Sequence, residues 1–226
     1  MPFLPNRKRI PVNYYPIYLD IAKKRCLVVG GGEVAERKVQ RLLECGAHVV
    51  VIGKALTPDL EAIKSDGGID HIDADYDTSH ILDAFLVIGA TDQEEVNARI
   101  SEDAKKWGIM VNIVDDPDKC DFILPSLFQQ GDLCVAISTG GKSPALAKKL
   151  RQDLEERYGP EYEMLIDILG KLREKIKTRG RSSDENRRLF ETVVNSDILR
   201  HIREKNWDRV KKTVHDLTGE DIEAES

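Results

Sequence analysis

Residues 25–35 read RCLVVGGGEVA and decide the predicted fold. A short apolar run, Arg25–Val29, ends in three glycines, and the chain then continues with apolar side chains at helical spacing. The turn has the form G-x-G-x-x-A, in which Gly30 permits a tight turn, Gly32 lets the backbone approach a pyrophosphate, and Ala35 keeps the helix near the sheet. The stretch therefore predicts a dinucleotide-binding βαβ unit.

Strand and helix patterns keep alternating around this unit. Apolar, β-branched runs predict strands, and stretches with a period of 3.6 residues predict helices. Strands are expected at 25–29, 48–52, 69–72, 84–90 and 109–114, and helices at 33–44, 56–65 and 94–107. This alternation is typical of an α/β fold with a Rossmann-type, doubly wound parallel sheet.

The pattern changes after the last of these strands. Two strand-like runs, 122–128 and 133–138, are joined by a polar turn around Gly131, which predicts a β-hairpin. From Ser143 onward the spacing is helical, with helices expected at 143–158, 161–177, 184–194, 196–204 and 206–217. We therefore expect an NAD-binding Rossmann domain at 1–115, a hairpin region at 116–150 and a helical domain at 151–226.

Composition excludes several classes of protein. The 226 residues carry a formal net charge of −6, which gives no reason to expect binding to nucleic acid. No run of about 18 apolar residues is present, so no membrane span is expected, and residues 1–21 lack the apolar stretch of a secretory signal. The cysteines lie far apart, at Cys26, Cys45, Cys120 and Cys134, so we expect free buried thiols, no zinc site and a cytoplasmic location.

One part of the dinucleotide fingerprint is missing. An acidic residue that binds the ribose 2′-hydroxyl is expected about twenty residues after the glycine turn, but the second strand ends in Gly53-Lys54-Ala55. Lys54 could instead accommodate the 2′-phosphate of NADP, so this turn leaves NAD and NADP open. Thr91-Asp92 follows a later strand, at the rim where Rossmann proteins complete the cofactor pocket. The same pair also resembles the start of a helical capping box with Glu94 or Glu95.

A polar stretch, Asn112–Pro117, follows the last parallel strand. The carboxyl ends of strands in an open α/β sheet are where ligands bind. A carboxylate there can accept a proton, and the adjacent Asp116 would raise the pKa of one of the two carboxyls. Asp115 is therefore a candidate catalytic residue, although Asp-Asp-Pro is also an ordinary turn.

A second glycine-rich turn, Ser138–Pro144, joins the predicted hairpin to a long helix. Its hydroxyls, glycines, Lys142 and helix start together predict an anion site. Ser143 as N-cap before Pro144 is also a regular helix start, so a solvated turn is the alternative. The spacing does not match a Walker A loop.

With its first glycine turn, the Asn112–Pro117 stretch and the Ser138–Pro144 turn, the chain resembles a known family. This is the stand-alone precorrin-2 dehydrogenase / sirohydrochlorin ferrochelatase family, equivalent to the N-terminal half of siroheme synthase. The motifs that carry the resemblance extend over most of the chain and are Tyr14–Asp20, Val28–Lys38, Ala90–Asp92, Asn112–Pro117, Phe122–Pro125 and Ser138–Ala147.

The resemblance implies NAD-dependent oxidation of precorrin-2 to sirohydrochlorin and, in many members, insertion of Fe²⁺ to make siroheme. It also implies a homodimer in which the 116–150 region exchanges its hairpin and following helix across the interface. Family members commonly use NAD without the usual acidic residue, which favours NAD over NADP. Two alternatives stay open: a dehydrogenase without chelatase activity, and a non-enzymatic module that binds NAD or a tetrapyrrole.

The resemblance and the motifs together give a set of candidate residues. The family's catalytic aspartate corresponds to Asp115. The predicted cofactor-binding residues are Gly30, Gly31, Gly32, Glu33, Val34, Lys54, Ala55, Thr91 and Asp92. The residues predicted to bind precorrin-2 and sirohydrochlorin are Asn112, Ser138, Thr139, Gly140, Gly141, Lys142 and Ser143, with Thr139 where the family has serine.

Overall fold

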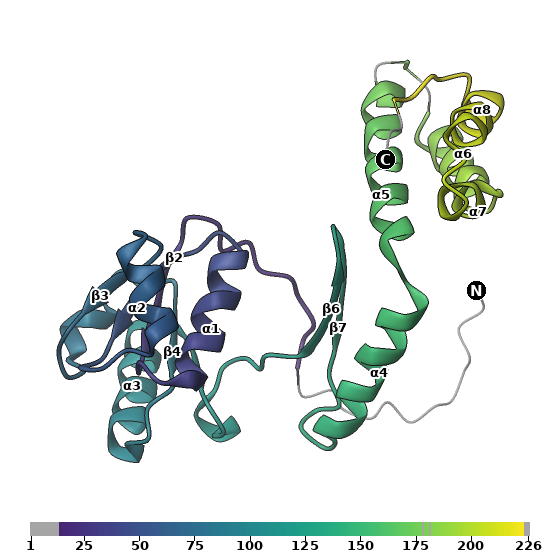
Figure 1. The fold of residues 1–226 in the computed structure, drawn as a ribbon. Helices are drawn as coiled ribbons and strands as arrows, with labels where there is room; N and C mark the ends of the chain where they lie inside the picture. Colours follow the sequence, from purple (N-terminus) through teal and green to yellow (C-terminus); the bar gives the residue numbers. More distant parts are fainter. Residues whose placement is uncertain (1–13, 178, 181, 224–226) are drawn as a thin grey trace. The chain divides into compact units, whose positions relative to one another are not determined.

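The computed structural model describes residues 14–177, 179–180 and 182–223, and it divides into two compact units, Met1–Leu124 and Pro125–Ser226 (Figure 1). The first division expected from sequence, at residue 115, precedes this one, and the second, at residue 150, lies within a helix. Most of residues 1–21, for which the sequence predicted no secretory signal, lies outside the described residues. Within the described part, no helix is long and apolar enough to cross a membrane.

The first unit contains the predicted parallel sheet. Its strand order is β3-β2-β1-β4-β5, and every neighbouring pair is parallel. The strands are β1 (Arg25–Val29), β2 (His48–Ile52), β3 (Asp70–Ile72), β4 (Leu86–Gly89) and β5 (Met110–Ile113). The helices are α1 (Glu33–Glu44), α2 (Pro58–Ser65), α3 (Glu94–Trp107) and the short 3₁₀ helices η1 (Thr78–Ile81) and η2 (Pro117–Lys119). This order confirms the doubly wound Rossmann-type fold.

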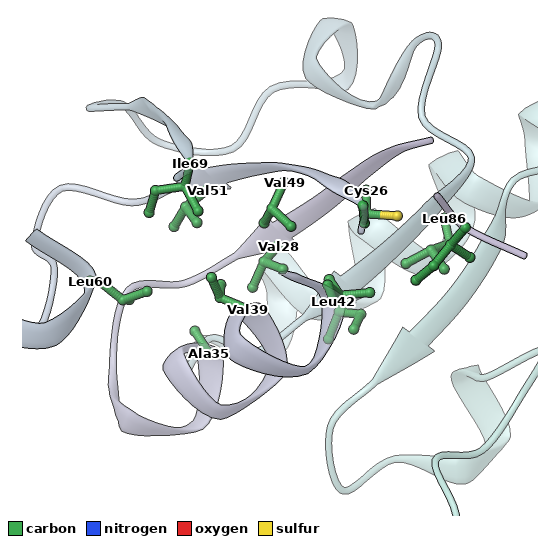
Figure 2. Close-up of a cluster of buried hydrophobic side chains, with 13 residues drawn as sticks. Cys26, Val28, Ala35, Val39, Leu42, Val49, Val51, Leu60, Ile69 and Leu86 are labelled. Carbon is green, nitrogen blue, oxygen red and sulfur yellow. The ribbon is translucent and has the colours of Figure 1, made fainter. Parts of the chain in front are cut away.

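Both faces of the sheet are covered by apolar side chains. Alternate residues of β1 point to opposite faces, so Cys26 and Val28 belong to one buried cluster and Leu27 to the other. The first cluster packs α1 and α2 against the sheet, through residues such as Val39 and Leu60 (Figure 2). Burial on both faces explains the nearly continuous apolar runs of these strands.

The second unit begins with an antiparallel hairpin and continues as helices, as the sequence predicts. Its elements are β6 (Ser126–Gln130), β7 (Leu133–Ile137), α4 (Pro144–Arg157), α5 (Pro160–Lys177), α6 (Ser183–Val194), α7 (Ile198–Arg203) and α8 (Trp207–Thr218). The helices α5 to α8 enclose a core of their own, which includes Leu172, Ile198 and Val210.

The predicted bounds of the first hairpin strand are wrong. Residues 122–125 are not a strand, because Pro125 has no N–H group for a ladder and the Phe122 carbonyl accepts a hydrogen bond from Asn112 instead. The strand continues through Gln130, so the turn is the two-residue Gly131–Asp132, with Gly131 at a φ of +55°.

Candidate active site

The sheet order brings three loops to one edge of the first unit. The strand order reverses between β1 and β4: the chain runs from β1 outward to β2 and β3, and then returns to place β4 on the other side of β1. Ligands bind at such points in open α/β sheets. The Ala90 N–H donates to the Val29 carbonyl at 2.8 Å, and the Val114 N–H donates to the Gly89 carbonyl at 2.9 Å. The ends of β1, β4 and β5 are therefore neighbours.

The three glycines after β1 have different surroundings. Gly30 has a φ of +120°, and a Cβ atom there would lie 2.4 Å from the Ala90 carbonyl oxygen. A Cβ atom on Gly31 would lie 1.9 Å from the Ala55 carbonyl oxygen. A Cβ atom on Gly32 would meet no protein atom within 4 Å. Packing thus requires Gly30 and Gly31, whereas Gly32 faces open space.

The helix that follows this turn starts without a side-chain cap. Gly32 is the N-cap of α1, and no side chain binds the first N–H groups of the helix. Thr57, which precedes α2, holds the turn and the start of α1. Its N–H donates to the Gly31 carbonyl at 3.0 Å, and its hydroxyl donates to Glu36 at 2.5 Å. Uncapped N–H groups beside open space suit a bound phosphate. Glu33 is exposed and Val34 half-buried beside them.

The lysine at the end of β2 has a partner that the sequence pattern did not reveal. Lys54 Nζ lies 2.6 Å from a carboxylate oxygen of Asp75, and both side chains are exposed. The neighbouring Ala55 carbonyl lies against the glycine turn at Gly31. The positive charge at the position that could accommodate a 2′-phosphate is therefore compensated within the protein.

The predicted capping box after β4 is wrong. The N-cap of α3 is Gln93, and no side chain caps that helix. Thr91 is engaged differently: its hydroxyl lies 3.0 Å from Asn97 Oδ1, and its carbonyl accepts from the Asn97 amide at 2.9 Å. Asp92 is exposed at the same rim. These bonds fix the loop that contacts Gly30.

Asp115 stands in a left-handed backbone conformation, with a φ of +62°. Its side chain is exposed, and among the residues that the structure describes we find no hydrogen bond or ion pair to its carboxylate. Non-glycine residues in this region carry a cost of about 1–2 kcal/mol and are frequent at functional sites.

Asp116 behaves differently from its neighbour. Its carboxylate lies 2.6 Å from Lys119 Nζ. The hydrogen bond from Lys119 holds the pKa of Asp116 below its usual value. The sequence predicted that one of these two adjacent carboxyls would have a raised pKa. The pKa of Asp116 is lowered instead.

One buried and one half-buried side chain support the Asp115 turn; of the four thiols expected to be buried, only that of Cys26 is. Asn112 is buried in β5, and its amide donates to the Phe122 carbonyl at 2.9 Å. The Cys120 sulfur accepts from the Ile113 N–H at 3.1 Å and lies 3.1 Å from the Asp116 carbonyl. Sequence reasoning missed this role of Cys120, because no local pattern distinguishes it from any other half-buried thiol.

In the second unit, the Ser138–Pro144 turn binds its own backbone. Ser138 accepts from the Gly140 N–H at 3.1 Å, and the Thr139 hydroxyl accepts from the Ser143 N–H at 3.1 Å. The Ser143 hydroxyl accepts from the Leu146 N–H at 3.2 Å, which confirms the predicted N-cap before Pro144. The hydroxyl oxygens of this turn are thus engaged in holding the turn itself.

Other groups in this turn are open to solvent. A Cβ atom on Gly140 or Gly141 would meet nothing within 4 Å, and Lys142 is exposed. Of the basic residues that follow on α4, Lys149 pairs with Asp153 and Arg151 pairs with Glu155. Lys142 and Lys148, both exposed and without an ion pair among the described residues, are therefore the lysines that a ligand could reach.

Comparison with known proteins identifies two consecutive segments. Residues 17–126 match the model of an NAD(P)-binding family, and residues 130–157 match the family described as "Sirohaem biosynthesis protein central". Siroheme synthase 1 of Aeromonas salmonicida is 41% identical over 188 residues, which are 83% of this chain and 40% of that protein. Siroheme synthase of Nitrosospira multiformis is 42% identical over 187 residues, which cover 81% of this chain and 40% of the length of that protein.

The chain thus spans about 40% of the length of these curated relatives. Among solved structures, the one described as "SirC, precorrin-2 dehydrogenase" matches with a TM-score of 0.73 and 24% identity. That match covers 88% of this chain and the whole of the other, so the two proteins share a fold.

Proposed function

Because the chain belongs to the siroheme synthase family, we propose that it is a precorrin-2 dehydrogenase, which oxidises precorrin-2 to sirohydrochlorin with NAD. The observation that carries the proposal is the order of the two matched segments, an NAD(P)-binding segment followed by a sirohaem-biosynthesis segment. The dehydrogenase that shares the fold supports the same reaction, since its description names precorrin-2. The free cysteines and the nicotinamide cofactor support a cytoplasmic location.

The first unit supplies the proposed cofactor site. The open space at Gly32 and the uncapped start of α1 fit a pyrophosphate. The residues proposed to hold the cofactor are Gly30, Gly31, Gly32, Glu33, Val34, Lys54, Ala55, Thr91 and Asp92. When bound, NAD supplies the hydride acceptor for the oxidation.

We propose NAD rather than NADP. Asp75 compensates the charge of Lys54 at 2.6 Å, so a 2′-phosphate would meet an ion pair instead of a free ammonium.

Asp115 is the proposed catalytic base. Removal of a hydride from precorrin-2 leaves a proton to be lost, and an exposed carboxylate without a protein partner can accept it. The left-handed backbone at Asp115, held by the bonds of Cys120, fixes the direction of this side chain. Asn112 acts beneath it by holding the chain after β5.

The second unit supplies proposed contacts to the carboxylate groups of the tetrapyrrole. Lys142 is exposed, and the α-carbons of Gly140 and Gly141 face open space, while Ser138, Thr139 and Ser143 hold the turn in shape. A homodimer is proposed through the hairpin and α4, because Leu146 and Leu150 are 50% and 41% exposed there. A two-stranded hairpin also needs further packing to be stable.

Insertion of Fe²⁺ into sirohydrochlorin is a second proposed activity. The relatives are named siroheme synthases, and siroheme contains iron. The unpaired Asp115 carboxylate could accept the pyrrole protons that the metal displaces. Incubation of the protein with sirohydrochlorin and Fe²⁺, without NAD, tests this activity separately, and no siroheme would leave a dehydrogenase alone.

The central test compares Asp115→Asn with Asp116→Asn. With precorrin-2 and NAD, we expect Asp115→Asn to lower kcat by about 10² to 10⁴ and to leave the Kd of NAD within about twofold. Asp116→Asn, the matched control, should keep kcat within about threefold because its carboxylate is paired with Lys119. Full activity of Asp115→Asn would overturn the assignment, and binding of NAD by wild-type protein without turnover would indicate a non-enzymatic module.

A further inference from the structure

Lys38 occupies a defined flank of α1. The residues Ala35, Val39 and Leu42 form the buried stripe of this helix and point into the sheet (Figure 2). Residues two apart differ by about 200° around a helix axis, so Glu36 and Lys38 lie on opposite sides of that stripe. The Glu36 side faces α2, because Glu36 accepts a hydrogen bond from Thr57.

The other flank, with Lys38, therefore faces the β4 and β5 side of the sheet. On that side the same apolar cluster continues through Ile88 of β4 and includes Val114, which directly precedes Asp115. Lys38 thus leaves the helix toward the edge where the proposed catalytic base stands.

The electrostatic environment agrees with this placement. Lys38 is half-buried. Burial lowers the pKa of its ammonium, the nearby charge of Arg37 lowers that pKa further, and the carboxylate of Asp115 acts in the opposite direction. The charge of Asp115 therefore acts on the Lys38 ammonium, although the two residues are far apart in the sequence and form no ion pair.

Two other lysines of the first unit already have anionic partners. Lys54 pairs with Asp75 and Lys119 pairs with Asp116, both at 2.6 Å. For Lys38, the described part of the protein provides no hydrogen bond and no ion pair. A half-buried ammonium without a hydrogen bond or ion pair costs free energy that an arriving anion would offset.

We propose that Lys38 binds a carboxylate side chain of the tetrapyrrole and thereby fixes the macrocycle beside Asp115. The inference rests on the proposed function, since it takes the tetrapyrrole as the anion. Lys38 is a substrate-binding residue in this view, and Asp115 keeps the proton transfer. A protein with a net charge of −6 needs such a local cation to hold a polyanionic substrate.

The test uses Lys38→Met, which keeps the length of the side chain and removes its charge, and Lys38→Arg, which keeps the charge. Lys106→Met, at an exposed lysine of α3, is the matched control. We expect Lys38→Met to raise the KM for precorrin-2 at least tenfold, with kcat and the Kd of NAD within about twofold. Lys38→Arg should bring KM back to within about threefold, and Lys106→Met should have no effect.

Two results would overturn the inference. One is an unchanged KM for precorrin-2 in Lys38→Met, and the other is a loss of NAD affinity at constant KM, which would make Lys38 a cofactor contact. A direct titration of sirohydrochlorin, followed by its absorbance, keeps the test independent of turnover. If wild-type protein does not oxidise precorrin-2, the proposed function fails, and a tenfold weaker Kd for sirohydrochlorin in Lys38→Met would still support the anion site. An equal Kd would reject it.

Discussion

The two glycine-rich turns of this protein look alike in sequence and differ in their surroundings. Each follows a strand and opens a helix, one at Gly30–Gly32 before α1 and the other at Gly140–Gly141 before α4. In the first turn, the Ala90 and Ala55 carbonyls lie so close to Gly30 and Gly31 that neither position has room for a Cβ atom. The helix that follows starts without a side-chain cap. In the second, nothing approaches the glycines, and Ser143 caps the helix.

The difference shows that a glycine can be required for two separate physical reasons, and that a third glycine can be free of both. Gly31 is required by the closeness of a neighbouring strand's loop, Gly141 by its own positive φ of +79°, and Gly32 by neither. A helix start whose N–H groups are uncapped, beside space that no side chain fills, is suited to a ligand. A start whose N–H groups bind a serine hydroxyl is already satisfied.

The largest expected effect is that of Gly31→Ala. The new Cβ atom would lie 1.9 Å from the Ala55 carbonyl oxygen, and backbone cannot move aside cheaply. We expect the free energy of unfolding to fall by about 3 kcal/mol, measured by urea denaturation, with faster hydrogen exchange in β1 and β2. Stability equal to that of wild type would contradict the packing argument for the first turn.

Gly141→Ala should have a smaller effect, confined to the second unit. Its Cβ atom would meet nothing, so only the left-handed backbone is unfavourable for alanine, at about 1.5 kcal/mol. Hydrogen exchange should rise at the start of α4 and stay unchanged in β1. A loss as large as that of Gly31→Ala would mean that the two turns do not differ as described.

Gly32→Ala separates binding from packing in the first turn. Its φ of −86° suits alanine, and no protein atom is within reach of the added methyl group. We expect the free energy of unfolding to change by less than about 0.5 kcal/mol and the Kd of NAD to rise about tenfold, because the methyl group occupies the space proposed for the pyrophosphate. Calorimetric titration with NAD measures the second quantity, and an unchanged Kd would remove Gly32 from the cofactor site.

The smallest effect is expected for Ser143→Ala. The substitution removes the hydroxyl that accepts the Leu146 N–H at 3.2 Å, so α4 should lose about 1 kcal/mol of local stability. Hydrogen exchange of the first turn of α4 measures the change. In the Ser143→Ala variant, hydrogen exchange in α1 should stay unchanged, because α1 has no such cap. An equal acceleration in α1 and α4 would contradict this account.

Much of the fold could be predicted because it depends on local patterns. The bounds of β1, α1 and β2 agree with the hydrophobic spacing, and the alternation of strands and helices implied the parallel sheet. The first strand of the hairpin was misplaced where a side-chain bond, from Asn112 to the Phe122 carbonyl, replaced a strand pairing. The capping box after β4 does not form because Thr91 binds Asn97 instead, another side-chain bond that hydrophobic spacing does not predict.

The sequence by itself determined the order of the elements, the glycine turn and the position of Asp115, since these follow from spacing within about twelve residues. Only the tertiary structure decided which groups face them. Lys54 meets Asp75 and Gly31 meets Ala55 through contacts that join separate strands and loops, and the charge of Asp115 acts on Lys38. Such contacts depend on strand order and helix rotation, which side-chain periodicity alone does not encode.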